Sequence, residues 1–464
     1  MYNNNITNVV IVGGGTAGWM TARNISKVKN LNVTIIESEN ILPIGVGEGS
    51  WPDFVRQLTY DNVSVINDLD GTFKGGVNYL DWYDNNDSIY NNWIHPFFNE
   101  SLVDNMFDKA KNDGTFKHNS ELTNLENLNS HNLIENACHF SAEKFQNVYR
   151  SICTNIENVN HIVSNVKDCE LDEETGYINS VILEDGKKIK GDFFIDCTGF
   201  KRLLISKMNP KFIDFSNELL CDRALVTHIN EKNKNNIYYT EAKAMSSGWT
   251  FKIPLQHKST FGYVYSSNFI SDENAKLELD SYLNKDPIDN FLNADNIEYR
   301  TIKFETGILR NSWINNCVAI GLSSGFFEPM EATNIGMISS QSTLIQSFLG
   351  KREHILKDIS KIIKQMNFYN DKIYNTSLNI RDYILFHYLF TNRNDSSFWR
   401  YISNDVRIPE RVYHMTKNVI KGMDDHLIDI HEPINFGTEV PFTVNSWVYA
   451  IVGYNFEKMK NKYA

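Results

Sequence analysis

Apolar and polar positions in the first part of the chain follow a strand, helix, strand order. Residues 8–12 form a short apolar, β-branched run, residues 19–23 are compatible with a helix, and residues 33–36 form a second apolar run. Runs of this kind predict buried strands, and a helix between two of them predicts a βαβ unit. We therefore expect an α/β fold built on a parallel sheet.

Strand patterns return further along the chain. Residues 178–183 and the run after Asp185-Gly186 predict a β-hairpin, because this dipeptide suits a tight turn. Residues 192–200 have the pattern of a buried strand that ends in a turn and leads the chain back to the first sheet. The first domain is therefore expected to be discontinuous.

A second sheet is expected between about residue 219 and residue 304. Residues 248–255 and 261–267 are its clearest strands, and they are expected to be neighbours. By contrast, residues 112–129 are rich in Asn and predict a surface insertion or an irregular helical segment.

The last part of the chain has helical periodicity. The pattern covers residues 335–349 and 352–366, and an aromatic-rich helical pattern continues through residues 383–388. We therefore predict two parts: residues 1–350, which form the discontinuous domain with its second sheet, and residues 351–464, which form a mainly helical cap.

Glycines between the first strand and the first helix have the spacing of a dinucleotide-binding loop. Gly13 permits a tight turn, Gly15 lets the backbone approach a pyrophosphate, and Gly18 permits close packing of helix on strand. The N-terminus of the helix attracts phosphate. Glu37 follows about 20 residues later, where an acid binds ribose hydroxyls. The plain alternative is an ordinary tight turn, but strand, helix and acid together favour a dinucleotide.

A second glycine-rich segment, residues 44–51, follows soon after the acid. It would let backbone lie against a bulky planar ring, so FAD is favoured over NAD. The residues predicted to hold this cofactor from the two segments and the acid are Gly13, Gly15, Thr16, Ala17, Gly18, Glu37, Gly47 and Glu48.

Composition narrows the class of partner. The 464 residues are 42% hydrophobic, enough for a large core, and the net charge of −12 argues against a nucleic-acid partner. The apolar stretches are all shorter than the roughly 18 residues that span a membrane. The six cysteines show neither C-x-x-C pairs nor zinc-ligand spacing, so we expect no metal site and a cytoplasmic protein.

Over almost its whole length the chain resembles the flavin-dependent halogenases of the tryptophan-halogenase family. Beyond the glycine loop, the matching segments are residues 45–48, 72–74, 95–97, 196–200, 319–326 and 328–331. The resemblance implies a Rossmann-like FAD-binding domain of the glutathione-reductase or hydroxylase type, a second sheet layer and a helical substrate cap. It also implies a divergent member, such as a phage-type enzyme.

The resemblance assigns catalytic roles to Lys74 and Glu331. In such enzymes reduced FAD and O2 oxidise a halide, and the hypohalous acid travels through a tunnel to a lysine, here Lys74. An ammonium would polarise the hypohalous acid, and a neutral amine would carry the halogen as a haloamine; either role needs a desolvated lysine. Glu331 would orient the hypohalous acid or accept the ring proton. The plain alternatives are an exposed lysine and a helix-terminal acid.

Further residues take their roles from the same resemblance. The backbone N–H groups of Thr333 and Asn334 would bind the halide at a helix N-terminus, where the helix dipole favours an anion. Val166, Leu322 and Ile335 would lie near the flavin.

The chain departs from the family pattern at three positions. Trp249 is the first Trp of the W-x-W-x-I-P signature, but Phe251 replaces the second, so the shielding of the flavin is expected to be looser. Both rings could equally be core aromatics. Ala332 and Asn334 stand where the family often has Ser and Gly. A changed pocket leads us to expect bromide or iodide to be used at least as well as chloride.

The substrate and the partner proteins are inferred from fewer residues than the cofactor. His95 and Phe97 match positions that sandwich the tryptophan ring, although they could be core residues. The region of Trp399, Trp447 and Tyr449 lacks a clear counterpart to the segment that grips the amino acid. We therefore expect phenols, indoles or other electron-rich arenes rather than free tryptophan. A separate NAD(P)H-dependent flavin reductase is implied, and relatives suggest a homodimer.

Two rival functions use the same fold. An aromatic hydroxylase would need no Lys74, and its late Gly-Asp motif is replaced here by Gly321-Leu322. A non-catalytic flavoprotein would have no reason to keep Lys74 and Glu331, although the loss of Trp at Phe251 speaks mildly for it.

Overall fold

The computed structural model describes residues 6–39, 47–83, 92–97, 137–232, 237–285, 297–424 and 441–463. The Asn-rich segment 112–129 and residues 44–46 of the second glycine segment lie outside these ranges. Within them, no helix is both long enough and apolar enough to cross a membrane.

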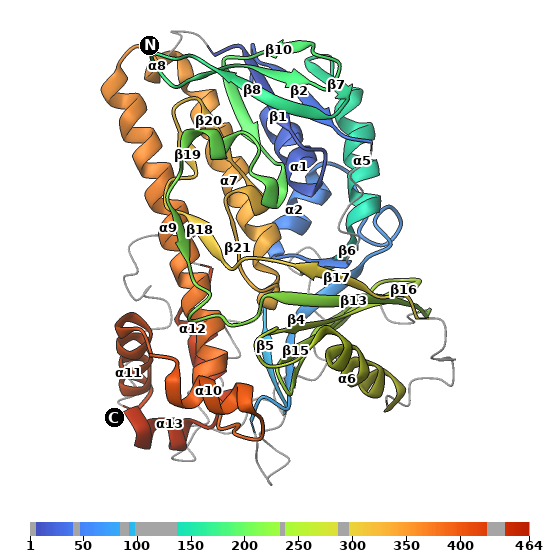
Figure 1. Cartoon of the computed structure of the whole chain (residues 1–464), viewed down its shortest axis with the longest axis vertical. Coiled ribbons are helices and arrows are strands. Elements are labelled where there is room, and N and C mark those ends of the chain that lie inside the picture. Colours follow the sequence, from blue (N-terminus) through green and yellow to red (C-terminus); the bar gives the residue numbers. More distant parts are fainter. Residues whose placement is uncertain are drawn as a thin grey trace.

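A six-stranded sheet forms the first layer (Figure 1). Its order is β19 (Trp313–Ile314), β20 (Cys317–Ala319), β11 (Phe193–Asp196), β1 (Asn8–Val12), β2 (Asn32–Glu37) and β7 (Val159–Val163). All neighbours are parallel except β19 and β20. The return of the chain at β11 confirms that the first domain is discontinuous.

Both faces of this sheet are covered at its centre, which explains why the central strand β1 is apolar from Val9 to Val12. Val9 and Ile11 face the core shared with helix α1 (Thr16–Ile25), whereas Val10 and Val12 face a small three-stranded sheet. That sheet consists of β8 (Val166–Leu171), β9 (Ile178–Leu183) and β10 (Lys188–Lys190). Gly186 has a φ of 84° between β9 and β10, so the expected hairpin is confirmed. Helix α5 (Ala142–Thr154) packs beside α1.

The second layer is a nine-stranded sheet, larger than the one expected from residues 219–304. That segment supplies β13 (Arg223–Asn230), β14 (Ile237–Met245), β15 (Gly248–Pro254), β16 (Lys258–Tyr265) and β17 (Arg300–Lys303). Four more strands come from earlier in the chain, namely β3 (Gly47–Gly49), β4 (Thr72–Leu80), β5 (Asn92–Pro96) and β6 (Ala137–Ser141). Parallel pairing of β4 with β14 joins the two groups. Local periodicity does not reveal this pairing, because its partners are far apart in sequence.

The remaining helices, strands and turns before α7 are mostly short. They are α2 (Pro52–Tyr60), α6 (Asp272–Lys285), the strands β12 (Phe212–Asp214), β18 (Gly307–Leu309) and β21 (Gly325–Phe326), and the 3-10 turns η4 (Gly199–Lys201), η5 (Ile205–Met208), η7 (Gly321–Ser323) and η8 (Met330–Ala332).

The C-terminal helices differ from expectation in one respect. Helix α7 (Thr333–Gly350) agrees with the prediction, but the expected helix at residues 352–366 is divided into α8 (Arg352–Ile355) and the 31-residue α9 (Ile359–Leu389). The Asp358 side chain accepts a hydrogen bond from the Ser360 N–H, which starts the second helix.

Helix α9 extends from the first layer into the C-terminal region (Figure 1). Asn370 bonds both the N–H and the carbonyl of Trp313 in β19, so the first half of α9 belongs with the first sheet. The C-terminal helices follow α9, and the expected domain boundary at residue 351 stays a prediction. Those helices are α10 (Ser397–Asp405), α11 (Glu410–Asp424), α12 (Val444–Gly453) and α13 (Phe456–Tyr463).

Candidate active site

The glycine loop between β1 and α1 opens onto a cavity. Gly13 has a φ of 112°, and a Cβ there would lie 2.3 Å from the Cys197 carbonyl oxygen. A Cβ at Gly18 would lie 1.8 Å from the Gly13 carbonyl oxygen, so α1 packs directly on the loop. At Gly15, the N-cap of α1, a Cβ would meet no atom within 4 Å. The backbone therefore presents an open face at a helix N-terminus, which suits a phosphate.

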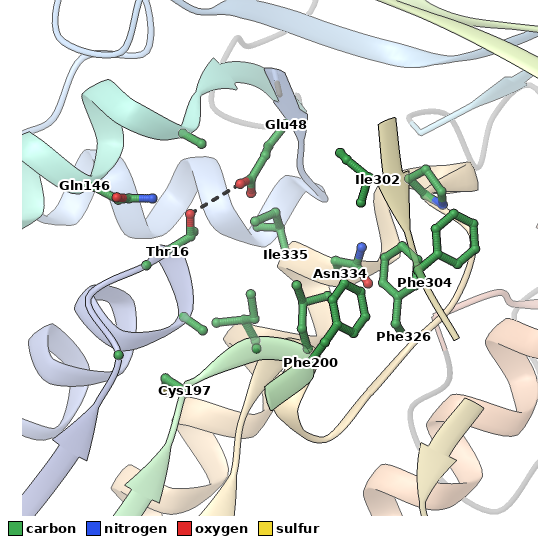
Figure 2. Close-up of a pocket in the computed structure, with 18 of the residues that line it drawn as sticks. Thr16, Glu48, Gln146, Cys197, Phe200, Ile302, Phe304, Phe326, Asn334 and Ile335 are labelled. Carbon is green, nitrogen blue, oxygen red and sulfur yellow. Dashed lines mark hydrogen bonds between the residues drawn. The ribbon is translucent and has the colours of Figure 1, made fainter. Parts of the chain in front are cut away.

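This first cavity encloses about 850 Å³ between the two large sheets. Figure 2 shows polar side chains of Thr16, Glu48 and Gln146 at one end and aromatic rings of Phe200, Phe304 and Phe326 at the other. A cofactor with a pyrophosphate at one end and a flat aromatic ring system at the other matches this division. The residues present therefore fit FAD.

Two predicted acids stand at the polar end. Glu37 ends β2 and lines the cavity, where its carboxylate accepts hydrogen bonds from Arg150 Nε at 2.9 Å and His161 Nε2 at 3.1 Å. Glu48 accepts a hydrogen bond from Thr16 Oγ1 at 3.3 Å, and burial raises its pKa to about 7. The tie between Glu37 and Arg150 was not expected from the sequence, because α5 lies far along the chain.

The other residues predicted to hold the cofactor also line this cavity, except Gly18, which packs against the loop itself. Besides Gly13 and Gly15, those on its wall are Thr16, Ala17, Gly47, Val166, Leu322 and Ile335. They come from α1, β3, β8, η7 and α7, so the fold gathers positions from most of the chain. Their contact with FAD stays a prediction.

Trp249 and Phe251 lie two residues apart on β15 and both face the first cavity. Their ring centroids are 6.1 Å apart. Trp249 Nε1 donates a hydrogen bond to Glu328 Oε2 at 2.9 Å, which fixes the indole. The Phe251 ring lies against Gly262 on β16, where a Cβ would be only 2.1 Å from the ring. The two rings stand where a shield for a bound ring would stand, and that role stays a prediction.

Lys74 lies on β4 and is 1% exposed, so the alternative of a solvent-exposed lysine is wrong. Its Nζ is 4.5 Å from the ring centroid of Phe97, and a Cβ at Gly49 would lie 3.3 Å from the same nitrogen. Burial lowers the pKa of Lys74 to about 8, against the opposing effect of Glu331. Both the ammonium and the neutral amine are therefore accessible near neutral pH.

Glu331 occupies a tight turn just before α7. Its φ is 64° and that of Ala332 is 56°, so two successive residues other than glycine adopt the left-handed region. Each such residue costs about 1–2 kcal/mol. Trp51 Nε1 donates to the Glu331 carbonyl oxygen at 3.0 Å and helps to hold the turn. The indole fits because Gly336 leaves room for it: a Cβ there would be 2.0 Å from the ring.

The Glu331 side chain is 2% exposed and is turned away from the helix it precedes. Oε1 accepts hydrogen bonds from the Tyr79 hydroxyl at 2.6 Å and from His95 Nδ1 at 2.8 Å. Oε2 has no hydrogen-bond partner among the described residues. Burial by itself raises the pKa of Glu331, but His95 and then Lys74 outweigh it and hold this pKa below its usual value. Glu331 is thus an ionised carboxylate with one oxygen unpaired.

The N-terminus of α7 faces the first cavity. Its N-cap is Ala332, which offers no side-chain oxygen to the first N–H groups of the helix. Asn334 lies on the cavity wall among aromatic side chains (Figure 2), whereas Thr333 is fully buried. Uncapped N–H groups and the helix dipole make this end suitable for an anion.

A second cavity of about 900 Å³ contains the predicted substrate residues. His95, Phe97, Phe442 and Tyr449 lie on its wall. The His95 and Phe97 rings are perpendicular, at 85° with centroids 5.6 Å apart, so they do not form the two parallel faces of a sandwich. Binding of an aromatic substrate by these two rings stays a prediction.

Aromatic residues of the C-terminal helices have different environments. Trp399 and Trp447 are fully buried core residues, and only Tyr449 of the three noted in the sequence lines the second cavity.

Three residues near Glu331 were missed by sequence reasoning. Trp51 was noted only as the end of a glycine-rich segment, and Tyr79 and His387 were not singled out. His387 lies at the end of α9, 3.2 Å from the Tyr79 hydroxyl through its Nε2. The alternation along β4 puts Tyr79 in a buried position, but no sequence signal connects it with Glu331, which is on another element.

The fold and site define an α/β protein with a cavity that fits a dinucleotide cofactor, beside a buried lysine and carboxylate. The chain matches the family described as tryptophan halogenase over residues 8–462. The tryptophan 7-halogenase KtzQ of Kutzneria sp. (strain 744) is 30% identical, with 86% of this chain and 79% of that protein covered. The tryptophan 6-halogenase ThaL of Streptomyces albogriseolus is 28% identical, with 96% and 88% covered.

Solved structures agree with this match. A flavin-dependent halogenase from Xanthomonas campestris superposes with a TM-score of 0.81 at 27% identity, covering 97% of this chain and 89% of that one. The chain therefore belongs to the tryptophan-halogenase family, and it is an enzyme of the flavin-dependent halogenase class.

Proposed function

We propose that this chain is an FADH2-dependent enzyme that generates hypohalous acid in the first cavity and delivers it past Lys74 to an electron-rich aromatic substrate in the second cavity. The observation that carries the proposal is the position of Lys74 and Glu331. Both line the first cavity, and their immediate contacts, Phe97 and His95, line the second. Reactive groups thus stand between a cofactor cavity and an aromatic one.

Reduced FAD bound in the first cavity would supply two electrons to O2, and the halide would supply the other two, so that O2 is converted into hypohalous acid and water. The loop at Gly13 to Gly18 would hold its pyrophosphate, and Glu37 its ribose hydroxyls. The chain has one dinucleotide loop, so we assign the supply of reduced FAD to a separate NAD(P)H-dependent flavin reductase. The indole of Trp249 and the smaller ring of Phe251 would keep the substrate away from the flavin.

Lys74 and Glu331 would then have different roles in the substitution at the aromatic carbon. The Lys74 ammonium donates a hydrogen bond to the hypohalous oxygen, which makes the halogen more electrophilic. As the carbon–halogen bond forms and the halogen–oxygen bond breaks, the departing hydroxide takes a proton from the Lys74 ammonium and leaves as water. Glu331 Oε2 accepts the proton from the ring, and transfer of a proton from Glu331 back to Lys74 restores both groups. The unpaired Oε2 supports this role, because a base needs a vacant lone pair directed at its substrate.

Phenols, indoles and related electron-rich arenes are the proposed substrate class. KtzQ and ThaL are named as tryptophan halogenases. The second cavity combines aromatic residues with hydroxyl and amide groups of Gln57, Ser340 and Asn445, and its wall also includes the charged residues Asp53 and Lys372. The neutral groups suit an arene with hydrogen-bonding substituents, whereas the charged residues would suit the ends of an amino acid, so free tryptophan is included in the test below as the alternative.

Bromide or iodide is the proposed halide. Asn334 and Ala332 lie on the wall of the first cavity at the uncapped N-terminus of α7. Larger halides are less costly to desolvate and are easier to oxidise, so a pocket altered at these two positions favours them.

A mass-spectrometric screen tests the proposal. Purified enzyme, FAD, a flavin reductase and O2 are combined with each halide, singly and in competition, and with a panel of arenes that includes tryptophan. We expect a halide-dependent mass gain that Lys74→Ala reduces by at least about 100-fold while flavin turnover continues. Lys252→Ala is the matched control, because Lys252 is also a buried strand lysine, 8% exposed, but lies outside the wall of the first cavity.

Other outcomes would contradict individual parts of the proposal. Halide-independent oxygen insertion would indicate a hydroxylase, and equal activity of Lys74→Ala would remove Lys74 from the reaction. Chloride product dominating the competition would refute the halide assignment, and free tryptophan as the sole good substrate would refute the substrate class.

A further inference from the structure

Glu331 is held by a phenol whose role no motif of the sequence suggests. Tyr79 lies on β4, five residues after Lys74, and its hydroxyl is 2.6 Å from Glu331 Oε1. His95 Nδ1, on the neighbouring strand β5, approaches the same oxygen to 2.8 Å. An ionised carboxylate can only accept hydrogen bonds, so both the phenol and Nδ1 carry the protons they share with it.

Two further rings stack against the Tyr79 ring, and they also stack on each other, with centroids 5.6 Å apart. Trp93 stacks on it with centroids 4.4 Å apart and planes 9° apart, and His387 stacks at 4.4 Å and 15°. Burial lowers the pKa of His387 to about 3, so this imidazole is neutral at ordinary pH. Burial and then Glu331 raise the pKa of Tyr79 well above its usual value, so the phenol keeps its proton. The Tyr79 hydroxyl is therefore held in a fixed position and keeps the proton that it donates to Glu331.

We propose that Tyr79 is a positioning residue for Glu331: with His95 it saturates Oε1, so that Oε2 alone is left to act on the substrate or the hypohalous acid. This inference rests on the proposed function for its catalytic consequence, but the hydrogen bond and its effect on Glu331 do not. Without the phenol, the carboxylate would lose a donor to its charged form, and rotation would let either oxygen face the cavity.

The consequence is a pH effect with a defined sign. A donor to the carboxylate favours its ionised form, so removal of that donor raises the pKa of Glu331. Several other titratable groups interact with Glu331, and Tyr79→Phe leaves all of them in place. They are Lys74 on β4, His95 on β5, Tyr383 and His387 on α9, and Tyr454 after α12.

The test compares Tyr79→Phe with Tyr383→Phe. The first variant keeps the stacked ring and removes only the hydroxyl. The second removes an equally buried hydroxyl that donates to the Ser446 carbonyl oxygen at 3.1 Å. In Tyr79→Phe we expect the acid limb of the pH profile for halogenation to move up by about one unit or more. In Tyr383→Phe we expect that limb to stay in place.

A double mutant and a spectroscopic titration separate positioning from a general structural role. If Tyr79 acts through Glu331, Tyr79→Phe has little further effect on the residual rate of Glu331→Ala. Independently of any activity, 13C-carboxyl-labelled glutamate in the full chain reports the Glu331 titration, identified by its loss in Glu331→Gln. We expect that titration to move to higher pH in Tyr79→Phe.

An unchanged Glu331 titration in Tyr79→Phe would overturn the inference even if the enzyme halogenates well. A shifted titration in a protein that does not halogenate would support the inference and reject the proposed function. A uniform loss of rate at every pH, without a shift, would show that the phenol is only structural.

Discussion

Glu328 and Glu331 show how neighbours set the chemistry of single residues. Both carboxyls are fully buried and three residues apart, yet their pKa values move in opposite directions. Burial raises the pKa of Glu328 to about 7, because its donors Tyr388 and Trp249 are neutral and only partly offset the loss of water. His95 and then Lys74 hold the pKa of Glu331 below its usual value, so Glu331 stays ionised. The neighbours of the two carboxyls therefore favour Glu331 as the proposed catalytic carboxylate.

The lowered pKa of Lys74 predicts how the rate of halogenation depends on pH. Its pKa of about 8 means that the ammonium predominates below that pH and the neutral amine above it. Glu331 stabilises the ammonium, so we expect the ammonium to be the active form and halogenation to decline as pH rises through about 8. Single-turnover measurements with chemically reduced FAD would follow this limb without the reductase. A rate that instead rises through the same pH would identify the neutral amine, and hence a haloamine, as the active form.

At the scale of elements, the start of α7 joins three parts of the site. The left-handed turn at Glu331 and Ala332 directs the carboxylate towards β4 and β5 and leaves the helix without a side-chain cap. Trp51, which directly precedes α2, secures the turn through its indole N–H. Gly336 on α7 makes room for that indole. One packing contact thus couples the proposed halide end of the helix to the proposed catalytic carboxylate.

We predict that Gly336→Ala disrupts this coupling. Alanine favours a helix interior by about 1 kcal/mol over glycine, but its Cβ would lie 2.0 Å from the Trp51 ring and displace it. Halogenation should fall about tenfold or more while FAD binding is kept, as measured by turnover and by flavin fluorescence titration. Gly350→Ala, in the same helix, is the matched control, since a Cβ there meets nothing within 4 Å. Equal behaviour of the two variants would refute the coupling.

At the scale of the whole molecule, the first cavity lies between the two large sheets. The six-stranded sheet carries the dinucleotide loop, the nine-stranded sheet carries Lys74, Trp249 and Phe251, and α9 packs against both regions (Figure 1). Buried ionisable groups between the layers link the stability of the fold to pH.

Glu328 provides the test of that link. Its pKa is raised from 4.5 to about 7 on folding, so the folded chain binds more protons than the unfolded chain between these values. The free energy of unfolding therefore falls as pH rises through this window. Glu328→Gln cannot ionise, so its stability relative to the native chain should increase by about 2 kcal/mol between about pH 5 and about pH 8. Urea unfolding without FAD would measure this change.

Glu331→Gln is the control for this prediction. The pKa of Glu331 is lowered on folding, so its carboxylate is ionised in both states throughout the range tested, and no gain in relative stability is expected. A gain of similar size in both variants would show that loss of any buried charge, rather than the raised pKa of Glu328, is responsible.

The sequence by itself determined the elements whose signals are local. The unit of β1, α1 and β2, the hairpin of β9 and β10, and helix α7 follow from periodicity and turn residues within a few positions of one another. The family motifs identified Lys74, Glu331 and the dinucleotide loop for the same reason: each is a short run of residues. All three were found without knowledge of their neighbours.

Only the tertiary structure decided how these parts meet. It placed β4 against β14, packed the first half of α9, which follows the expected boundary at residue 351, on the first sheet, and brought Tyr79 and His95 to one oxygen of Glu331. It also set the direction of each pKa shift, because burial and charge depend on what surrounds a side chain. Such contacts join residues far apart in the chain and arise from long-range packing, so no local pattern encodes them.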